Sequence, residues 1–181
     1  MVENGNGKVS DGSARALASS VLVGVVTALA LACGSNGEAP TESPGVPQGA
    51  TQLQVERPSW SSQLGRIQER TRSVIRDRAT WESFWSRFGG VRIPPPELPQ
   101  IDFEERMVIV AAMGQRSASG FEIAVETVYE QNGTLHVSVL ETSPAAGCLS
   151  AQNVTTPVTA VVVPLRDAPV EFVEREQSRP C

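Results

Sequence analysis

Residues 120–141, GFEIAVETVYEQNGTLHVSVLE, decide the fold expected for this chain. The first half alternates apolar and polar side chains, which is typical of a half-buried β-strand. Asn132-Gly133 is the strongest short hairpin signal, and the second half returns with the same alternation. This stretch therefore predicts two antiparallel strands with one apolar face. The residues expected on that face are Phe121, Ile123, Val125, Val128, Leu135, Val137 and Val139.

Segments on both sides of this hairpin also have strand patterns. Residues 105–114, ERMVIVAAMG, contain a continuous apolar run, which is typical of a strand buried on both faces. Further strands are expected within residues 70–77, 158–165 and 169–176, and residues 166–168 have the length of a hairpin loop. Because short turns join consecutive strands, the pattern predicts an antiparallel meander of about six strands, sandwich-like or half-barrel-like.

One segment has a helical pattern. In residues 77–90, DRATWESFWSRFGG, the apolar residues stand at i, i+3, i+4 and i+7, which forms one stripe of a helix. Asp77 is a suitable N-cap, and Gly89-Gly90 is a suitable stop. We expect the stripe to pack on the sheet rather than to bind a ligand, so the fold class is α+β. Its members are Trp81, Phe84, Trp85 and Phe88.

The N-terminal part reads as an export leader followed by a tether. Residues 16–32, ALASSVLVGVVTALALA, carry no charge and follow a weakly positive region, so residues 1–32 are predicted to be a signal peptide. The leader ends in a loose lipobox, which predicts that Cys33 is acylated and holds the chain to membrane lipid. Residues 33–50 are rich in Gly, Pro, Ser and Glu and are expected to form a flexible tether before a folded domain at 51–181.

This reading places the mature protein outside the cytoplasm, lipid-anchored to the cell membrane or the outer membrane, in the periplasm or on the cell surface. The alternative for the leader is an uncleaved membrane anchor, since about 17 apolar residues is the lower limit for crossing a bilayer. The chain has three cysteines. With Cys33 assigned to lipid, Cys148 and Cys181 remain, and we expect them to form the sole disulfide in an oxidising compartment.

The composition and motifs favour a binding module over an enzyme. The formal charge is −5 and the basic residues are dispersed, which argues against a nucleic-acid partner. His136 is the only histidine, and its place in the alternating pattern directs it away from the core. We find no nucleophile elbow, metal-ligand set, phosphate loop or other cofactor motif, and no evident small-molecule site. A hydrolase that uses His136, or a purely structural envelope lipoprotein, is the alternative.

The segment MGQRSASGF, residues 113–121, is the strongest candidate for recognition. Arg116 is the only charged residue between Arg106 and Glu122, and its neighbours are small. Exposed loops on rigid scaffolds often carry binding, and arginine is enriched in binding hot spots. The alternatives are a flexible hairpin tip, or an Arg116 side chain that folds back onto Glu122 or Glu141. The residues expected to contact a partner are Gly114, Arg116, Ser117, Ser119 and Gly120.

A family resemblance is carried by residues 101–125, IDFEERMVIVAAMGQRSASGFEIAV, by TWESFW before them, and by LHVSVLETSP and PVTAVVVP after them. These segments resemble the C-terminal domain of the PrcB-like protease-complex subunit family. The resemblance extends over residues 60–175, although this chain has Ser119-Gly120-Phe121 where that family often has Gly-Gly-Tyr. It implies a lipoprotein accessory subunit that associates with and stabilises an exported protease, without catalytic activity of its own. The motifs that carry the resemblance are Pro99, Asp102, Phe103, Gly114, Arg116, Gly120 and Phe121.

Overall fold

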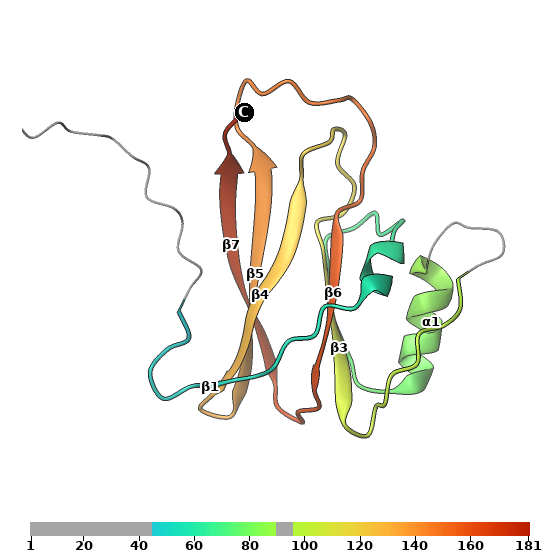
Figure 1. Cartoon of the computed structure of the whole chain (residues 1–181), viewed down its shortest axis with the longest axis vertical. Helices are drawn as coiled ribbons and strands as arrows, with labels where there is room; N and C mark the ends of the chain where they lie inside the picture. The colour runs from blue at the N-terminus through green and yellow to red at the C-terminus, as the bar shows by residue number, and fades with distance from the viewer. Residues whose placement is uncertain (1–44, 90–95) are drawn as a thin grey trace, which may run out of the picture. The chain divides into compact units, whose positions relative to one another are not determined.

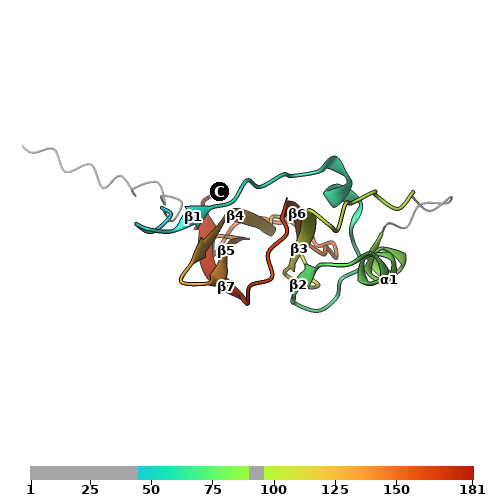
Figure 2. The ribbon, with the colours of Figure 1, turned by 90° about the horizontal axis from the view of Figure 1, so that it is seen from below.

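The strands of this chain form two sheets that pack face to face, with one α-helix on the outer side of the second sheet (Figures 1 and 2). The computed structural model describes residues 45–89 and 96–181, so the predicted signal peptide, Cys33 and most of the predicted tether lie outside the described residues. Within these residues, no helix combines the length and the apolar character needed to cross a bilayer.

The strand order is β1-β4-β5-β7 in the first sheet, named sheet A here, and β2-β3-β6 in the second, named sheet B. The α+β class, the strand-rich sandwich and the aromatic helix are therefore confirmed. In chain order the elements are β1 (Thr51–Gln52), the 3-10 helix η1 (Ser59–Gln63), β2 (Thr71–Ile75), α1 (Arg78–Phe88), β3 (Arg106–Ala112), β4 (Glu122–Gln131), β5 (Thr134–Pro144), β6 (Val158–Pro164) and β7 (Val170–Arg179).

The hairpin predicted at Asn132-Gly133 is confirmed. Both residues have left-handed φ angles, 51° and 75°, as the tight turn between β4 and β5 requires. Strand β4 also contains a bulge, because Val125 pairs with Val139 while Thr127 pairs with Ser138. The extra residue shifts the alternation by one position. The bulge therefore explains why Val128 faces the core although it is out of phase with Val125.

The predicted meander is wrong beyond this hairpin. Strand β7 pairs with β5 in parallel, and β6 belongs to the other sheet. Residues 113–121 join β3 of sheet B to β4 of sheet A, and residues 165–169 join β6 to β7, so both connections cross between sheets and neither closes a hairpin. A strand's own pattern reports which of its faces are buried, and it does not identify the neighbouring strand.

Strand β3 lies between two apolar cores, as its continuous apolar run predicts. Its residues from Met107 to Ala112 are all fully buried. Met107, Ile109 and Ala111 face the core between the two sheets. The alternate residues face a second core, which sheet B forms with α1 and η1. The molecule therefore has three layers, and the aromatic residues of α1 fill the outer one.

Helix α1 begins and ends where the sequence predicts. The Asp77 carboxylate accepts a hydrogen bond from the Thr80 backbone N–H at 2.8 Å, and this bond lowers the pKa of Asp77. Gly89 is the C-cap, and a Cβ there would lie 2.6 Å from the Trp85 carbonyl oxygen. Trp81 and Trp85 are buried, and their indole N–H groups donate to the carbonyl oxygens of Pro99 and Pro96. Residues 96–99 are thereby fixed to the helix.

Backbone hydrogen bonds tie the two sheets together along one side. The chain between β1 and η1 leaves β4, where Leu53 N–H donates to the Val128 carbonyl at 2.8 Å, and reaches β6 of the other sheet. There Glu56 and Val162 exchange two backbone hydrogen bonds of 2.9 Å. This short segment therefore bridges the gap between β4 and β6.

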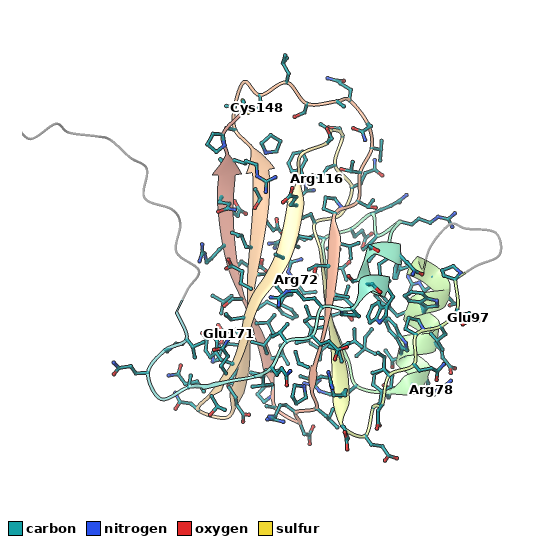
Figure 3. All side chains as sticks on the ribbon, in the orientation of Figure 1. Arg72, Arg78, Glu97, Arg116, Cys148 and Glu171 are labelled. Carbon is teal, nitrogen blue, oxygen red and sulfur yellow. A yellow bond between two sulfur atoms is a disulfide. The ribbon has the colours of Figure 1, made fainter. Side chains whose placement is uncertain are left out.

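Ion pairs tie the sheets together along the other side. Arg72 projects from β2 into the space between the sheets, where Figure 3 labels it, and its guanidinium lies 2.5 Å from Glu141 of β5 and 2.7 Å from Glu174 of β7. Arg70 joins the same two carboxylates at 3.0 and 3.1 Å. The sandwich is thus held together along both edges.

Candidate partner-binding surface

Two sheet-to-sheet connections meet at one end of the sandwich, at the top of Figure 1. We name the surface formed by residues 114–121 and 145–157 the loop end. Figure 3 labels Arg116 and Cys148, one from each connection, at this end of the molecule. The predicted recognition segment therefore does not stand alone, because the connection from β5 to β6 lies beside it.

Backbone hydrogen bonds fix the first connection to the second. The N–H of Arg116 donates to the Thr155 carbonyl at 2.8 Å, and the N–H of Thr155 donates to the Arg116 carbonyl at 2.9 Å. Ser119 N–H bonds the Ala151 carbonyl at 3.0 Å, and the Thr155 hydroxyl bonds the Ala118 carbonyl at 3.0 Å. These bonds fix residues 116–119 to the second connection. The interpretation of residues 113–121 as a flexible hairpin tip is therefore wrong.

The side chain of Arg116 does not fold back onto either glutamate considered from the sequence. Glu122 pairs with Arg179 at 2.6 Å, and the buried Glu141 pairs with Arg70 and Arg72. Within the described residues, the guanidinium of Arg116 has no ion-pair partner. It lies 5.7 Å from the ring centroid of Phe121, a cation–π distance that leaves its charge available to a partner.

The structure separates the predicted contact residues into two groups. Ser117 and Gly120 are exposed and Ser119 is half-buried, so a partner protein can reach these residues. Gly114 is buried and cannot touch a partner, which corrects its place in the predicted site. Its φ is 77°, and a Cβ there would lie 2.8 Å from the Gln68 carbonyl oxygen. Gly114 therefore serves the packing of the segment before β2.

Sequence reasoning missed two apolar residues of the loop end. Leu149 is 104% exposed and Val154 is 67% exposed, and they are the large hydrophobic residues that stand out as exposed in the described part of the chain. They belong to the connection that carries the hydrogen bonds to Arg116 and Ser119. Exposed apolar side chains and an arginine without an ion-pair partner are both typical of protein-binding surfaces, and the loop end carries both.

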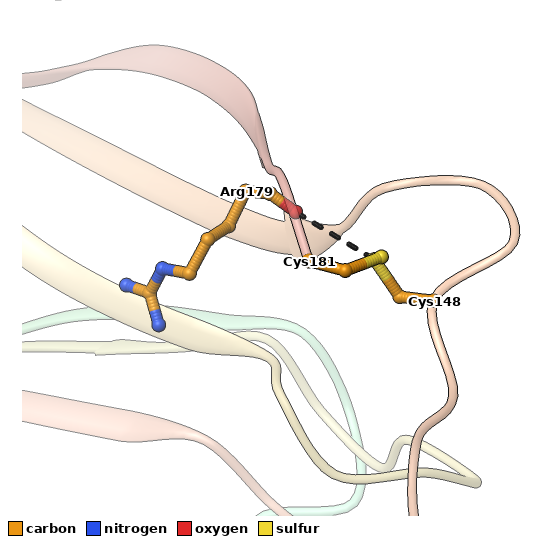
Figure 4. Close-up of a disulfide and its surroundings, with 3 residues drawn as sticks. All are labelled: Cys148, Arg179 and Cys181. Atoms are coloured by element: carbon orange, nitrogen blue, oxygen red, sulfur yellow. Dashed lines mark hydrogen bonds between the residues drawn. A yellow bond between two sulfur atoms is a disulfide. The ribbon is translucent and has the colours of Figure 1, made fainter.

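The predicted disulfide between Cys148 and Cys181 is present and fixes the same connection (Figure 4). The two Cα atoms lie 5.6 Å apart, and Ala145 N–H donates to the Arg179 carbonyl at 2.9 Å beside the bridge. The dashed line in Figure 4 joins Cys148 Sγ to the Arg179 carbonyl oxygen at 4.0 Å. A disulfide sulfur carries no proton, so we treat this approach as a van der Waals contact. The bridge joins the end of β7 to the residue before Leu149.

His136 lies on the outer face of sheet A, as the alternation predicts. Its ring stacks on Tyr129 at 5.0 Å, and its Nδ1 lies 3.6 Å from a carboxylate oxygen of Glu171. These neighbours supply a carboxylate and a ring but no serine or cysteine nucleophile. In residues 45–89 and 96–181, no group of three His, Cys, Asp or Glu side chains is placed to hold a metal ion.

A family model described as PrcB C-terminal matches residues 107–164. Residues 107–164 are thus similar to the PrcB C-terminal family. The match confirms the resemblance seen in the sequence, over a shorter range than residues 60–175. It runs from β3 to the end of β6 and contains both connections of the loop end, whereas α1 and β7 lie outside it. No curated protein and no solved structure matches the chain at a significant level.

Proposed function

We propose that this protein is a non-catalytic subunit of a protease complex that binds and stabilises an exported protease. The similarity of residues 107–164 to the PrcB C-terminal family supports a role of this kind. The observation that carries the proposal is the loop end. It lies within those residues and combines an unpaired Arg116 with the exposed side chains of Leu149 and Val154.

The loop end suits binding because its backbone is already ordered. Backbone bonds join the two connections, and the disulfide holds the second one to β7. A preorganised surface loses little conformational entropy when a partner binds. In this proposal Arg116 pairs with a carboxylate or carbonyl group of the protease, and Leu149 and Val154 enter apolar depressions on it.

The proposal also includes export and attachment to the membrane through an acylated Cys33. The charge-free leader and loose lipobox support it, and so does a disulfide that suits an oxidising compartment. The tether would hold the sandwich away from the lipid headgroups, in a position to meet a protease outside the cytoplasm.

Affinity capture from the native membrane tests this function. The full-length protein is used as bait, and Arg116→Ala and Leu149→Ser are compared with it, with Arg78→Ala as the control. Arg78 is an exposed arginine of α1 whose ion pair with Glu82 contributes little to stability. We expect Arg116→Ala to weaken capture of a protease at least tenfold, which corresponds to about 1.4 kcal/mol. Unfolding curves should stay unchanged.

Two results would count against the proposal. Capture of a protease at full strength by both loop-end variants would remove the loop end from the interface. Failure of the unmodified bait to enrich any protease would favour a structural envelope lipoprotein. The hydrolase alternative is tested separately, because it requires that His136→Ala abolish a measurable hydrolytic activity of the purified protein.

A further inference from the structure

A groove of about 450 Å³ lies between helix α1 and the outer face of β2, within the described residues. Its floor includes the hydroxyl side chains of Thr71 and Ser73. One wall is formed by Phe84 and Phe88, whose rings are half-buried and lie 4.9 Å apart between centroids. No residue of the loop end lines the groove, although the Gln68 carbonyl accepts a hydrogen bond from Gln115 N–H at 2.9 Å.

Two arginines that line the groove, Arg66 and Arg87, have no ion-pair partner among the described residues. The guanidinium of Arg87 lies 5.1 Å from the ring centroid of Phe88, which places its charge beside the apolar wall. Glu69 is the one acidic residue of the lining, so the lining carries net positive charge in a protein of net charge −5. By contrast, many arginines of the described chain form ion pairs: Arg70, Arg72, Arg78, Arg106, Arg166, Arg175 and Arg179.

The backbone at Arg66 is unusual for a residue with a side chain. Its φ is 57°, in the left-handed region where glycine is accommodated more easily. The preceding Gly65, which bonds the Phe88 carbonyl, does not have this conformation. Strained backbone often occurs at binding sites, where the strain orients a side chain that makes a contact. Here it belongs to one of the two unpaired arginines of the groove.

We propose that this groove binds an acidic, extended segment of a partner protein, with an apolar side chain seated against Phe84 and Phe88. The apolar wall fits one large side chain, while Arg66 and Arg87 can each pair with a carboxylate. The hydroxyl groups of the floor offer hydrogen bonds to a peptide backbone. A purely apolar ligand would leave both guanidinium groups unpaired, and a purely acidic ligand would leave the aromatic wall uncovered. This inference is independent of the proposed role of the loop end.

Fluorescence anisotropy with the purified full chain tests the inference. The probe is a fluorescein-labelled peptide, Glu-Leu-Glu-Phe-Glu-Leu, and two further peptides replace either every Glu by Lys or every apolar residue by Ser. We expect saturable binding of the first peptide, with at least tenfold weaker binding of the other two. Arg87→Gln and Arg66→Asn should each weaken binding at least fivefold, because asparagine tolerates the left-handed backbone that Arg66 adopts.

A groove-filling variant and a matched control complete the experiment. Ser73→Phe adds a ring to the floor of the groove without removing any packing, and we expect it to abolish binding while the unfolding curve is retained. Arg78→Gln removes an arginine from the same helix outside the groove and should bind the peptide like the wild type. Absence of saturable binding would overturn the inference. Equal binding of the serine peptide, or an equal loss in Arg78→Gln and Arg87→Gln, would also overturn it.

Discussion

At the residue scale, Gly114 shows how one position constrains two segments. Its left-handed φ and the close backbone of residues 68–70 both exclude a side chain, since a Cβ would lie 2.8 Å from the Gln68 carbonyl oxygen and 2.9 Å from the Arg70 nitrogen. We predict that Gly114→Ala lowers the free energy of unfolding by about 2–4 kcal/mol, measured by urea denaturation.

Gly133 is the matched control for this change. Its φ of 75° is nearly the same, but nothing lies within 4 Å of an added Cβ. Gly133→Ala should therefore show only the backbone cost of the left-handed conformation, about 1–2 kcal/mol. If the two substitutions have equal effects, the close approach at Gly114 does not contribute.

Glu141 makes stability depend on pH. Burial alone would raise its pKa, but hydrogen bonds from Arg72 and Arg70 outweigh burial, so the pKa of Glu141 is lowered. The folded state therefore holds this proton less tightly than the unfolded state, and the stabilisation is present above the unfolded pKa. It is lost as pH falls from about 4.3 through the folded value.

We predict that Glu141→Gln costs roughly 3 kcal/mol at pH 7, because two arginine side chains lose a buried carboxylate. Between pH 5 and pH 3 the variant should lose less stability than the wild type, as measured by denaturant titration at each pH. Glu122→Gln serves as the comparison. The pKa of Glu122 is also lowered, by its hydrogen bonds with Arg179, but this pair is exposed and should contribute far less. Parallel pH curves for Glu141→Gln and the wild type would contradict the prediction.

At the element scale, the disulfide connects the last strand to the connection that carries Leu149. It closes a loop with a sequence separation of 33 residues. We predict that the double variant Cys148→Ser/Cys181→Ser loses roughly 2–4 kcal/mol of stability. The wild type should respond to a reducing agent by a lower midpoint of thermal unfolding, whereas the variant should not respond. Two free thiols in the denatured, unreduced wild type would show instead that the bridge is absent.

The elements that could be predicted are those whose signals are local. The hairpin at Asn132-Gly133 and the limits of α1 depend on neighbouring residues in the sequence, and both are confirmed. The parallel pairing of β5 with β7 could not be predicted. The two strands are separated by β6, and the pattern of β6 is the same whether it pairs with β7 or lies in the other sheet.

The same limit applies to the candidate site. The lack of an ion-pair partner for Arg116 within the described residues could be inferred, because no other charged residue lies near it in the sequence. The exposure of Leu149 and Val154 could not be inferred, because it results from the path that the chain follows between two sheets. The buried position of Gly114 depends on residues 68–70, which contact it only in the folded chain.

At the scale of the whole molecule, the proposed attachment to the membrane predicts a simple chemical signature. Lys8 is the only lysine of the chain and lies within the predicted signal peptide. We predict that the protein extracted from membranes lacks residues 1–32 and carries a diacylglyceryl group on Cys33, as measured by its intact mass. Amine-reactive reagents should find no lysine side chain in it, which leaves the α-amino group of Cys33 as their target. An unmodified chain that begins at Met1 in the membrane fraction would contradict this prediction.

The parallel pairing of β5 with β7 also has a consequence for how the chain reaches its native state. The β4–β5 hairpin joins residues close in sequence and can form early, whereas the first β5–β7 pair joins Leu135 to Val170. Pairings between distant residues slow folding, because the entropy of closing a long loop must be lost before the contacts form. We therefore expect strand β7 to dock late. Cys181 follows β7, so its oxidation with Cys148 should be a late event that marks chains whose two sheets are already assembled.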